Sequence, residues 1–347
     1  MQKVHLSILS LLLVSLLTSS PGHAQKDFYS GKTITIIAGT KAGDVYDLYA
    51  RMFAQFMPKY IPGNPNIIVQ NMAGAGSMIA ANHVYNVSDP DGLTLGAIFP
   101  ALYFDQLVGR PEVRFDWAKF VWLGSPVTSN HLLYMRADAP YKTIHDLVQA
   151  APAAPKCGAT GTSSTAFYIP KLLDQTIGTN FNIILGYQSG QDIDLAVERG
   201  ELACRSFTIT AFFAREPFIT WRKNNFVNVL MQTGRKPDQR LKDIPTIYEL
   251  MNKYNTPPAG RSLATLVLAA GDFGRPYVLP PKTPPDRVKI IRDAFEKVMS
   301  DEAALADAKK KRLEIDPSSS EELEMLAKEV TSQPQEVVAK MKELLKN

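Results

Sequence analysis

The stretch TITIIAGTKAGDVYDLYARMFAQFM, residues 33–57, contains a strand, a loop and a helix in immediate succession. Its first six residues are β-branched or apolar and predict a buried strand. Residues 39–44 include glycine, threonine and aspartate, which are typical of a loop. Leu48, Phe53 and Phe56 then recur at helical spacing and predict a helix over residues 45–57. A strand that passes through a short loop into a helix is the building unit of an α/β fold.

The same order of strand, loop and helix returns along the chain. Residues 66–69, 73–76 and 77–87 form a second such unit, and residues 93–98 predict a third strand. Further strands are predicted at residues 121–124, 132–135, 157–160, 182–185 and 202–207, with helices at 165–175 and 191–198. Strands that alternate with helices indicate an α/β fold with mainly parallel sheets flanked by helices.

Several helix starts are marked by capping residues. Thr143, with Asp146 three residues later, predicts a capping box. In the run Thr283-Pro284-Pro285-Asp286 we expect the threonine to cap a helix whose first residue is Pro284. The run Ser318-Ser319-Ser320-Glu321 predicts a further start.

The two series of elements predict two lobes, one inserted into the other. Residues 226–231 are interpreted as a strand that returns the chain to the first lobe. We therefore place the first lobe at residues 25–124 and 229–347, and the second lobe at residues 125–228. A chain of 347 residues is long enough for two such domains. Two connections between lobes are expected to act as a hinge.

Residues 1–24 have the organisation of a cleavable signal peptide. Lys3 precedes an apolar run over residues 8–17, and Pro21 and Gly22 break that run. Small residues at Gly22 and Ala24 occupy the positions that signal peptidase inspects, so we expect cleavage after Ala24. The apolar run is shorter than the roughly 20 residues of a membrane span. The mature chain is therefore expected to act outside the cytoplasm.

Charge and cysteine content narrow the class of protein further. The net charge is +4 at pH 7, and no tract is polybasic, so nucleic acid is not an expected partner. The chain has two cysteines, Cys157 and Cys204. An oxidising compartment allows them to form a disulfide, and two separate buried thiols are equally compatible with the sequence.

Sequence motifs for catalysis are missing. The chain contains no Gly-x-Ser-x-Gly elbow, no Walker-type loop and no His-Glu-x-x-His motif. His83, His131 and His145 fall on different predicted elements without metal-ligand spacing, and we expect them at the surface. Residues 39–43 lack the partner acid of a dinucleotide site. We therefore expect a binding protein without enzyme activity, metal or cofactor.

Three loops of small residues each follow a predicted strand and precede a predicted helix. The unpaired N–H groups and the dipole of a helix N-terminus favour an anion, and glycine or alanine lets a carboxylate approach closely. Ligands of open α/β sheets bind at the carboxyl ends of the strands, where all three loops are expected. Ordinary turn chemistry accounts for any single loop. The candidate ligand-binding residues in these loops are Gly39, Thr40, Lys41, Ala42, Gly43, Ala75, Thr160, Gly161, Thr162 and Ser163.

Further polar and aromatic candidates adjoin these loops. Asp47 lies in the first turn of a predicted helix, where it either serves the backbone or receives a ligand hydroxyl. Phe99 and Tyr187 each follow a strand, and their rings either line the ligand site or pack in the core. Arg205 lies near Glu198 and Glu201, so a structural ion pair is expected rather than a contact with a ligand.

Several short motifs follow one another in a particular order. They are Ile34-Thr35-Ile36-Ile37 with its glycine loop, Asp47-Leu48-Tyr49-Ala50-Arg51, Asn71-Met72-Ala73-Gly74-Ala75-Gly76, Asp89-Pro90-Asp91-Gly92-Leu93-Thr94-Leu95, Gly186-Tyr187, Ile244-Pro245-Thr246-Ile247-Tyr248-Glu249 and Pro280-Pro281-Lys282-Thr283-Pro284. Their order and spacing together resemble the Bug-type periplasmic solute-binding proteins of tripartite tricarboxylate transporters. The resemblance covers essentially the whole mature chain.

The resemblance implies a type II Venus-flytrap fold that closes on a small carboxylate. It implies delivery of that acid to a transporter with a large and a small inner-membrane subunit, by a monomer that diffuses in a Gram-negative periplasm. Ligand contacts, largely through backbone groups and waters, are implied for residues 39–47 and 160–163. The first loop is one residue longer than in the family, and Tyr187-Gln188-Ser189 replaces its usual Tyr-Lys-Gly. The resemblance therefore does not specify which acid is bound.

Two other functions can use the same scaffold. A ligand-sensing module that feeds a signalling receptor would have the same sequence features. A periplasmic enzyme would need a nucleophile and a base, and the sequence offers no such pair. We favour capture of a small mono-, di- or tricarboxylate, or of an aromatic acid, for transport.

Overall fold

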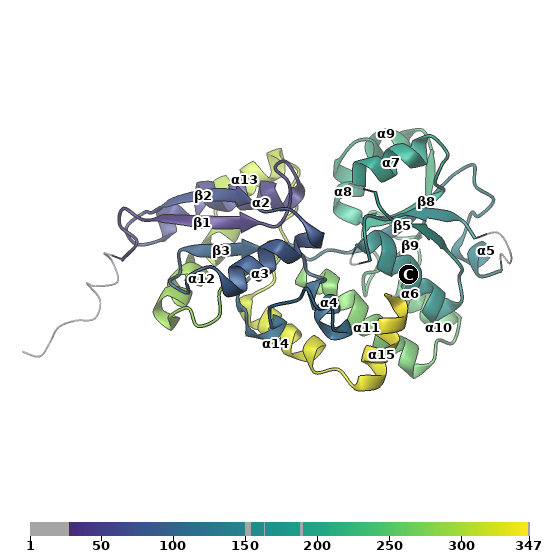
Figure 1. Ribbon diagram of the computed structural model, residues 1–347. Helices are drawn as coiled ribbons and strands as arrows, with labels where there is room; N and C mark the ends of the chain where they lie inside the picture. The colour runs from purple at the N-terminus through teal and green to yellow at the C-terminus, as the bar shows by residue number, and fades with distance from the viewer. Residues whose placement is uncertain (1–27, 150–153, 163, 188–189, 346–347) are drawn as a thin grey trace, which may run out of the picture.

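The computed structural model describes residues 28–149, 154–162, 164–187 and 190–345. Two five-stranded sheets, each flanked by helices, lie side by side in two lobes (Figure 1). The predicted α/β class is confirmed. The predicted signal peptide at residues 1–24 lies outside the described residues, as do Ser163, Gln188 and Ser189.

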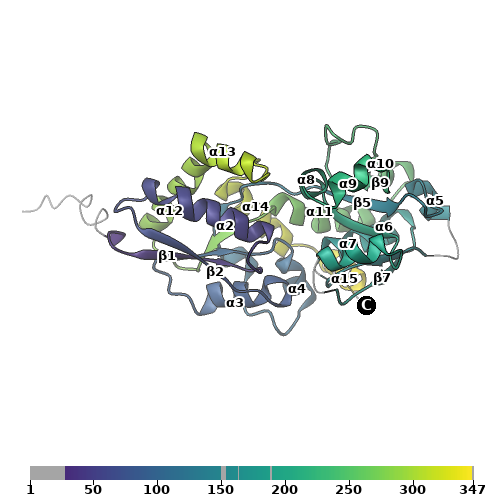
Figure 2. The same ribbon diagram turned by 90° about the horizontal axis from the view of Figure 1, so that it is seen from above.

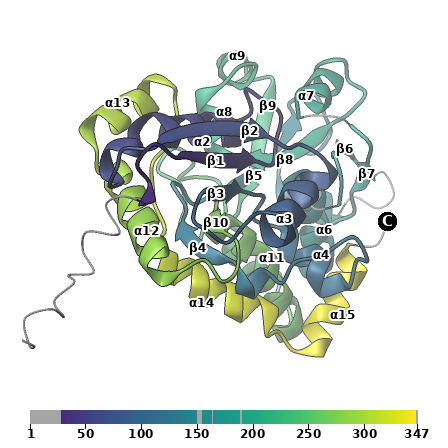
Figure 3. The ribbon, with the colours of Figure 1, turned by 60° about the vertical axis from the view of Figure 1, so that its left-hand side comes forward.

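The sheet of the first lobe has the strand order β2-β1-β3-β10-β4, which can be followed in Figure 3. Strands β1, β2 and β3 are parallel, and β10 is antiparallel to both of its neighbours. The sheet is therefore mainly parallel, as predicted, and one strand opposes the other four. The strands are β1 (Thr33–Ala38), β2 (Asn66–Asn71), β3 (Thr94–Ala97), β4 (Val121–Gly124) and β10 (Tyr277–Leu279).

Successive side chains of β1 point to opposite faces of this sheet and enter two different cores. Ile34 and Ile36 pack with the helices α2 (Val45–Phe56), α12 (Pro285–Met299) and α13 (Glu302–Lys310). Ile37 packs on the other face, with α3 (Met78–Asn86), α4 (Leu102–Val108) and α14 (Ser320–Thr331). Figure 2 shows α2, α12 and α13 on one side of β1 and β2, and α3 and α4 on the other.

The sheet of the second lobe has the strand order β7-β6-β8-β5-β9. Strand β5 is antiparallel to β8 and β9, while β6 is parallel to β7 and β8. The expectation that residues 226–231 return to the first lobe is wrong, because β9 pairs along β5 and buries Leu230 and Met231 there. The strands are β5 (His131–Arg136), β6 (Lys156–Gly158), β7 (Asn182–Ile184), β8 (Cys204–Thr208) and β9 (Val227–Gln232).

The same alternation along β5 builds two faces of the second sheet. Leu132 and Tyr134 pack with α7 (Gly190–Glu198), α8 (Ile209–Ala214) and α9 (Phe218–Lys223). Leu133 and Met135 pack on the other face, with α6 (Thr165–Ile177), α10 (Ile247–Lys253) and α11 (Pro258–Phe273). The short helix α5 (Ile144–Gln149) follows β5.

One hydrophobic core runs from the first lobe into the second. It joins the α3 and α4 face of the first sheet to the α6 and α11 face of the second. Helix α15 (Gln335–Leu344) contacts α4, α6 and α11 and thereby bridges the two lobes (Figure 1). On the α13 side, Arg312 Nη1 donates to the carbonyl of Ala214 at 2.8 Å. The two lobes are thus connected by packing as well as by the chain.

Some predicted helix starts are confirmed and one is wrong. The Thr143 and Asp146 capping box is present, with both of its hydrogen bonds formed. The α12 helix begins at Pro285 rather than Pro284, and its cap is Pro284. Thr283 does not cap, because its hydroxyl donates to the carbonyl of Pro280 at 2.8 Å. Single 3₁₀ turns occur at η1 (Pro58–Tyr60), η2 (Ala75–Ser77) and η3 (Trp117–Lys119). Within the described ranges, no helix has the length and apolar character needed to cross a bilayer.

Candidate functional site

Three loops of the first lobe interlock at the carboxyl ends of β2, β1 and β3. These strands are adjacent and parallel, so their following residues reach the same edge of the sheet. Gly39 lies so close to Ser77 that a Cβ on the glycine would stand 1.8 Å from the serine Oγ. That Oγ accepts a hydrogen bond from the Phe99 N–H at 3.3 Å. The predicted site residues Gly39 and Phe99 therefore meet around one buried hydroxyl.

Asp47 holds the first loop against the sheet. Its carboxylate accepts from the Gly43 N–H at 2.8 Å, from Arg51 Nε at 2.8 Å and from Asn71 Nδ2 at 2.9 Å. The same amide of Asn71 also donates to the carbonyl of Thr40 at 3.2 Å. Burial acts to raise the pKa of Asp47, but the three hydrogen bonds outweigh it and the pKa is lowered. Both carboxylate oxygens thus accept hydrogen bonds from the protein, and Asp47 holds the loop in place.

The other predicted residues of this lobe lie on the surface of the same edge. Thr40 is buried, while Lys41, Ala42 and Gly43 are exposed at the start of α2. Ala75 is exposed and has a φ of 45°, in the left-handed region that alanine seldom adopts. The backbone of both loops is therefore open to solvent above the Gly39 and Ser77 contact.

The second lobe places its predicted loop between β6 and α6. Thr160 is exposed, and Gly161 and Thr162 are half-buried. The Ser164 hydroxyl donates to the carbonyl of Gly161 at 2.7 Å. The Thr162 hydroxyl accepts from Arg110 Nη2, of the first lobe, at 2.6 Å. This hydrogen bond brings the loop of the second lobe next to the first lobe. Ser163, which was also predicted to bind the ligand, lies outside the described residues.

Tyr187 follows β7, which is parallel to β6, so it lies at the same edge of the second sheet as the Thr160 loop. It is half-buried and packs against the core of that lobe, with its Cε2 3.2 Å from where a Cβ on Gly158 would stand. Desolvation raises the pKa of its hydroxyl. The ring therefore packs against the core of the second lobe, which is one of the two roles considered for it, and remains partly accessible.

Aromatic rings from both lobes converge beside α2. The ring of Tyr46 lies 4.8 Å from that of Phe99, centroid to centroid. Burial raises the pKa of Tyr168 on α6, and the nearby Tyr46 hydroxyl raises it further. Tyr46, in the first turn of α2, thus lies where the predicted edge of the first lobe approaches the second. Sequence reasoning did not single it out, because a tyrosine in a helical pattern is typical of core packing.

A group of charged residues surrounds this junction. Asp44 caps α2 and accepts from the Tyr46 N–H at 3.1 Å. Its side chain is exposed, yet desolvation raises its pKa, against the opposing effects of Arg215 and Arg275. A carboxyl that is both exposed and desolvated is open to solvent on one side and surrounded by protein on the others. Arg215 comes from the second lobe, and Arg275 precedes β10 of the first sheet.

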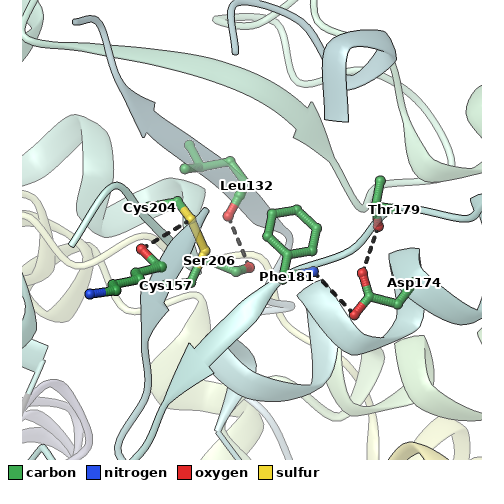
Figure 4. The surroundings of a disulfide bond; sticks show 8 residues. Leu132, Cys157, Asp174, Thr179, Phe181, Cys204 and Ser206 are labelled. Carbon is green, nitrogen blue, oxygen red and sulfur yellow. Dashed lines mark hydrogen bonds between the residues drawn. A yellow bond between two sulfur atoms is a disulfide. The ribbon is translucent and has the colours of Figure 1, made fainter. Parts of the chain in front are cut away.

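The two cysteines form a disulfide in the second lobe (Figure 4). Cys157 of β6 and Cys204 of β8 are direct partners in adjacent strands, with their Cα atoms 4.5 Å apart. Both are fully buried. The bond therefore links the strand that precedes the Thr160 loop to the centre of the sheet, and it lies behind the candidate site rather than in it.

Other regions were considered as ligand or metal sites. A cavity of about 440 Å³ lies along α12, where Lys289 pairs with Asp293 at 2.7 Å and Arg292 pairs with Glu324. Glu296 and Glu321 also line it, so its acidic side chains outnumber Lys289 and Arg292, which does not suit an anion, and none of the three loops contributes to it. No group of three or more metal-ligating side chains is found in the part of the chain that the structure describes.

The fold is that of two-lobed periplasmic binding proteins. The chain belongs to the family described as the tripartite tricarboxylate transporter family receptor, which matches residues 50–343. Members of this family are binding receptors of transporters rather than enzymes.

Individual relatives support the same assignment. The UPF0065 protein in the TAR-I ttuE-ttuC' intergenic region of Agrobacterium vitis is 30% identical over 253 residues, which is 69% of this chain and 68% of the relative. The periplasmic binding protein BugD has a TM-score of 0.65 at 17% identity, covering 91% of this chain and 97% of its own. MatC from Rhodopseudomonas palustris with bound malate has a TM-score of 0.64 at 18% identity, covering 91% and 99%. The two structures share the fold of this chain.

Proposed function

We propose that this protein captures a small organic carboxylate between its lobes and delivers it to a tripartite tricarboxylate-type transporter of the inner membrane. The observation that carries the proposal is the meeting of Gly39, Ser77 and Phe99 at one sheet edge. The Arg110 to Thr162 hydrogen bond brings the loop of the second lobe next to that edge. Backbone N–H groups at the starts of α2 and α6 are suited to a carboxylate.

The proposed ligand contacts follow from this arrangement. Exposed backbone and hydroxyl groups contact the acid directly, and Phe99 and Tyr187 line the site. Asp47 acts indirectly, since its oxygens already bind Gly43, Arg51 and Asn71. The direct contacts in this proposal are Gly39, Thr40, Lys41, Ala42, Gly43, Ala75, Thr160, Gly161, Thr162 and Ser163.

The remaining parts of the proposal concern the exported chain. A first lobe that begins at residue 25 and a second lobe that includes β9 close on each other about the connections between them. Cleavage after Ala24 releases the chain into the periplasm as a monomer that reaches the large and small transporter subunits by diffusion. The family relationship and the malate bound to MatC support carboxylate transport over sensing by a receptor.

Thermal-shift screening against mono-, di- and tricarboxylates and aromatic acids tests the proposal. A ligand at 100 times its dissociation constant stabilises the folded state by about 2.7 kcal/mol, so at least one acid should raise the melting temperature. Mass spectrometry of ligand released from natively purified protein then identifies the acid. If the whole panel gives no shift, and calorimetry detects no heat of binding, the proposal is wrong.

A further inference from the structure

Arg275 lies where the connections between the lobes meet. It stands between α11 and β10, and its N–H donates to Ser125 Oγ at 2.9 Å. Its Nη1 donates to Ser129 Oγ at 3.1 Å, in the segment that links β4 to β5. The preceding Gly274 has a φ of 62°, and a Cβ there would stand 1.8 Å from the carbonyl oxygen of Val127. This close approach fixes the position of Arg275 against the connecting segment.

The guanidinium of Arg275 is buried and lacks an anionic partner. Only 4% of the residue is exposed. Among the described residues no carboxylate lies within 4.0 Å of it, and its Nε has no hydrogen-bond acceptor. Burial of an unpaired charge costs several kcal/mol in general, so a retained one needs a compensating role.

Aromatic rings beside the candidate site pack around this guanidinium. Its carbon lies 5.6 Å from the ring centroid of Tyr46 and 5.4 Å from that of Tyr49, within the range of cation–π attraction. Tyr46 is the residue that contacts Phe99 at the loop edge. The guanidinium therefore lies next to the first two turns of α2, beside the ring that contacts Phe99.

Arg275 also belongs to an unbalanced set of charges. Asp44 lies within the electrostatic range of Arg275 from its own lobe and of Arg215 from the opposite lobe. Arg215 is half-buried, and it is not in an ion pair within 4.0 Å in the described part of the chain. The neighbouring Asp47 and Glu314 are paired with Arg51 and Arg240. Arg215 and Arg275 are thus two cations around the one remaining acid, Asp44, beside the N-terminus of α2, which itself favours anions.

We propose that Arg275 is a buried cationic contact for a carboxylate of the ligand, assisted by Arg215 from the second lobe, and that the site therefore selects acids with at least two carboxylates. This inference rests on the proposed function. One carboxylate binds the exposed loop backbone, and another binds the arginine fork. Arginine suits this role because its planar guanidinium can bind a carboxylate through two parallel hydrogen bonds.

The test combines a change in the protein with a matching change in the probe. The probes are succinate, malate, glutarate and adipate, each compared with its half-amide, in calorimetric titrations of the wild-type chain. For the acid that binds most tightly, Arg275→Met should weaken binding about 10- to 100-fold, as expected for loss of a charge-assisted hydrogen-bonded contact. The half-amide should bind the wild type more weakly than the diacid does, by a similar factor. In R275M the half-amide and the diacid should bind with nearly equal affinity. Arg275→Lys keeps the positive charge but lacks the planar guanidinium, so its affinity for the diacid should lie between those of the wild type and R275M.

Matched controls separate this effect from misfolding and from net charge. Lys289→Met removes one positive charge on the outer face of α12 and should leave the affinity unchanged. Arg215→Gln changes a half-buried residue of the other lobe and should weaken binding by a smaller factor. If circular dichroism shows that R275M is unfolded, Arg215→Gln and the comparison of diacid with half-amide in the wild type still test the inference.

The outcomes distinguish this inference from the function on which it rests. Binding of a diacid that is equally tight in the wild type and a folded R275M overturns the inference and leaves carboxylate capture intact. Equal binding of each diacid and its half-amide to the wild type does the same. Failure of every diacid to bind a wild type that binds a monocarboxylate in the thermal-shift panel overturns the inference alone, whereas failure of that whole panel contradicts the proposed function and the inference together.

Discussion

The buried Arg275 and the largely buried Arg205 have opposite surroundings. Arg205, on β8 of the second lobe, binds Asp194 at 2.6 Å and the carbonyl of Gly190 at 3.0 Å. The Tyr134 hydroxyl donates to the same oxygen of Asp194, Oδ1, at 2.8 Å. Arg275, at the junction of the lobes, binds one serine hydroxyl and has no carboxylate within 4.0 Å among the described residues.

The contrast separates an arginine that serves the fold from one that is available to a ligand. The charge of Arg205 is paired with that of Asp194, and this pair joins β8 to α7, although the Nε of Arg205, like that of Arg275, has no hydrogen-bond acceptor among the described residues. The site around Arg275 carries excess positive charge, and an anion would complete it. Substitutions of the two residues should therefore differ most in their effect on stability.

Loss of Arg205 should destabilise the protein far more than loss of Arg275. Arg205→Met leaves the buried Asp194 without its cation, and breaking a buried pair in this way costs about 3 to 5 kcal/mol. Arg275→Met removes a buried charge that has no carboxylate partner, so the free energy of unfolding without ligand should fall by no more than about 1 kcal/mol and is expected to rise. Urea denaturation at pH 7 measures both. An equal loss in the two variants would show that Arg275 is a structural residue.

The backbone beside Arg275 should be intolerant of any side chain. Gly274→Ala places a Cβ 1.8 Å from the carbonyl oxygen of Val127 at a φ of 62°, so strain and overpacking together should cost about 2 to 4 kcal/mol. Gly178→Ala is the matched control, because Gly178 has a φ of 78° with nothing within 4 Å of the added Cβ. It should cost about 1 to 2 kcal/mol. Equal denaturation midpoints for the two variants would contradict the close contact.

Much of the first lobe could be predicted because local pattern and turn chemistry determine it. The six apolar residues from Thr33, the glycine loop and the spacing of Phe53 and Phe56 predict β1, its loop and α2, and adjacent parallel strands then bring their loops to one edge. The capping box at Thr143 is likewise a local signal. Contacts within a few residues suffice for all of these.

Elements whose partners lie far away in sequence were missed or misplaced. Helix α11 is buried on nearly every side between the lobes, from Leu263 to Ala270, so no amphipathic period marks it. The apolar strand β9 carries no signal for which sheet it joins. Arg205 was expected to pair with Glu198 or Glu201 and binds Asp194 instead, because α7 presents Asp194 to β8. His131 was expected at the surface and is buried. An arginine without a partner, such as Arg275, is visible only once the surrounding residues are placed.

The pH dependence of the free energy of unfolding should show whether Arg275 carries a charge that acts on the buried His131. His131 is buried at the start of β5, and burial, with a further contribution from Arg275, lowers its pKa to about 3. The unfolded chain has a histidine pKa of about 6.5. Below that value the unfolded state binds a proton that the folded state does not, so stability is lost as the pH falls from about 6.5 toward 3. Between pH 7 and pH 5 this amounts to about 2 kcal/mol.

Variants assign this loss to His131 and to its neighbour. His131→Gln should remove about 2 kcal/mol of the difference in unfolding free energy between pH 7 and pH 5, whatever it does to stability at pH 7. Arg275→Met should remove a smaller part, because it leaves the burial of His131 in place and takes away only the repulsion between two cations. Urea denaturation at the two pH values measures both changes. If R275M has the same pH dependence as the wild type, the guanidinium does not act on His131, and the excess positive charge assigned to this junction is absent.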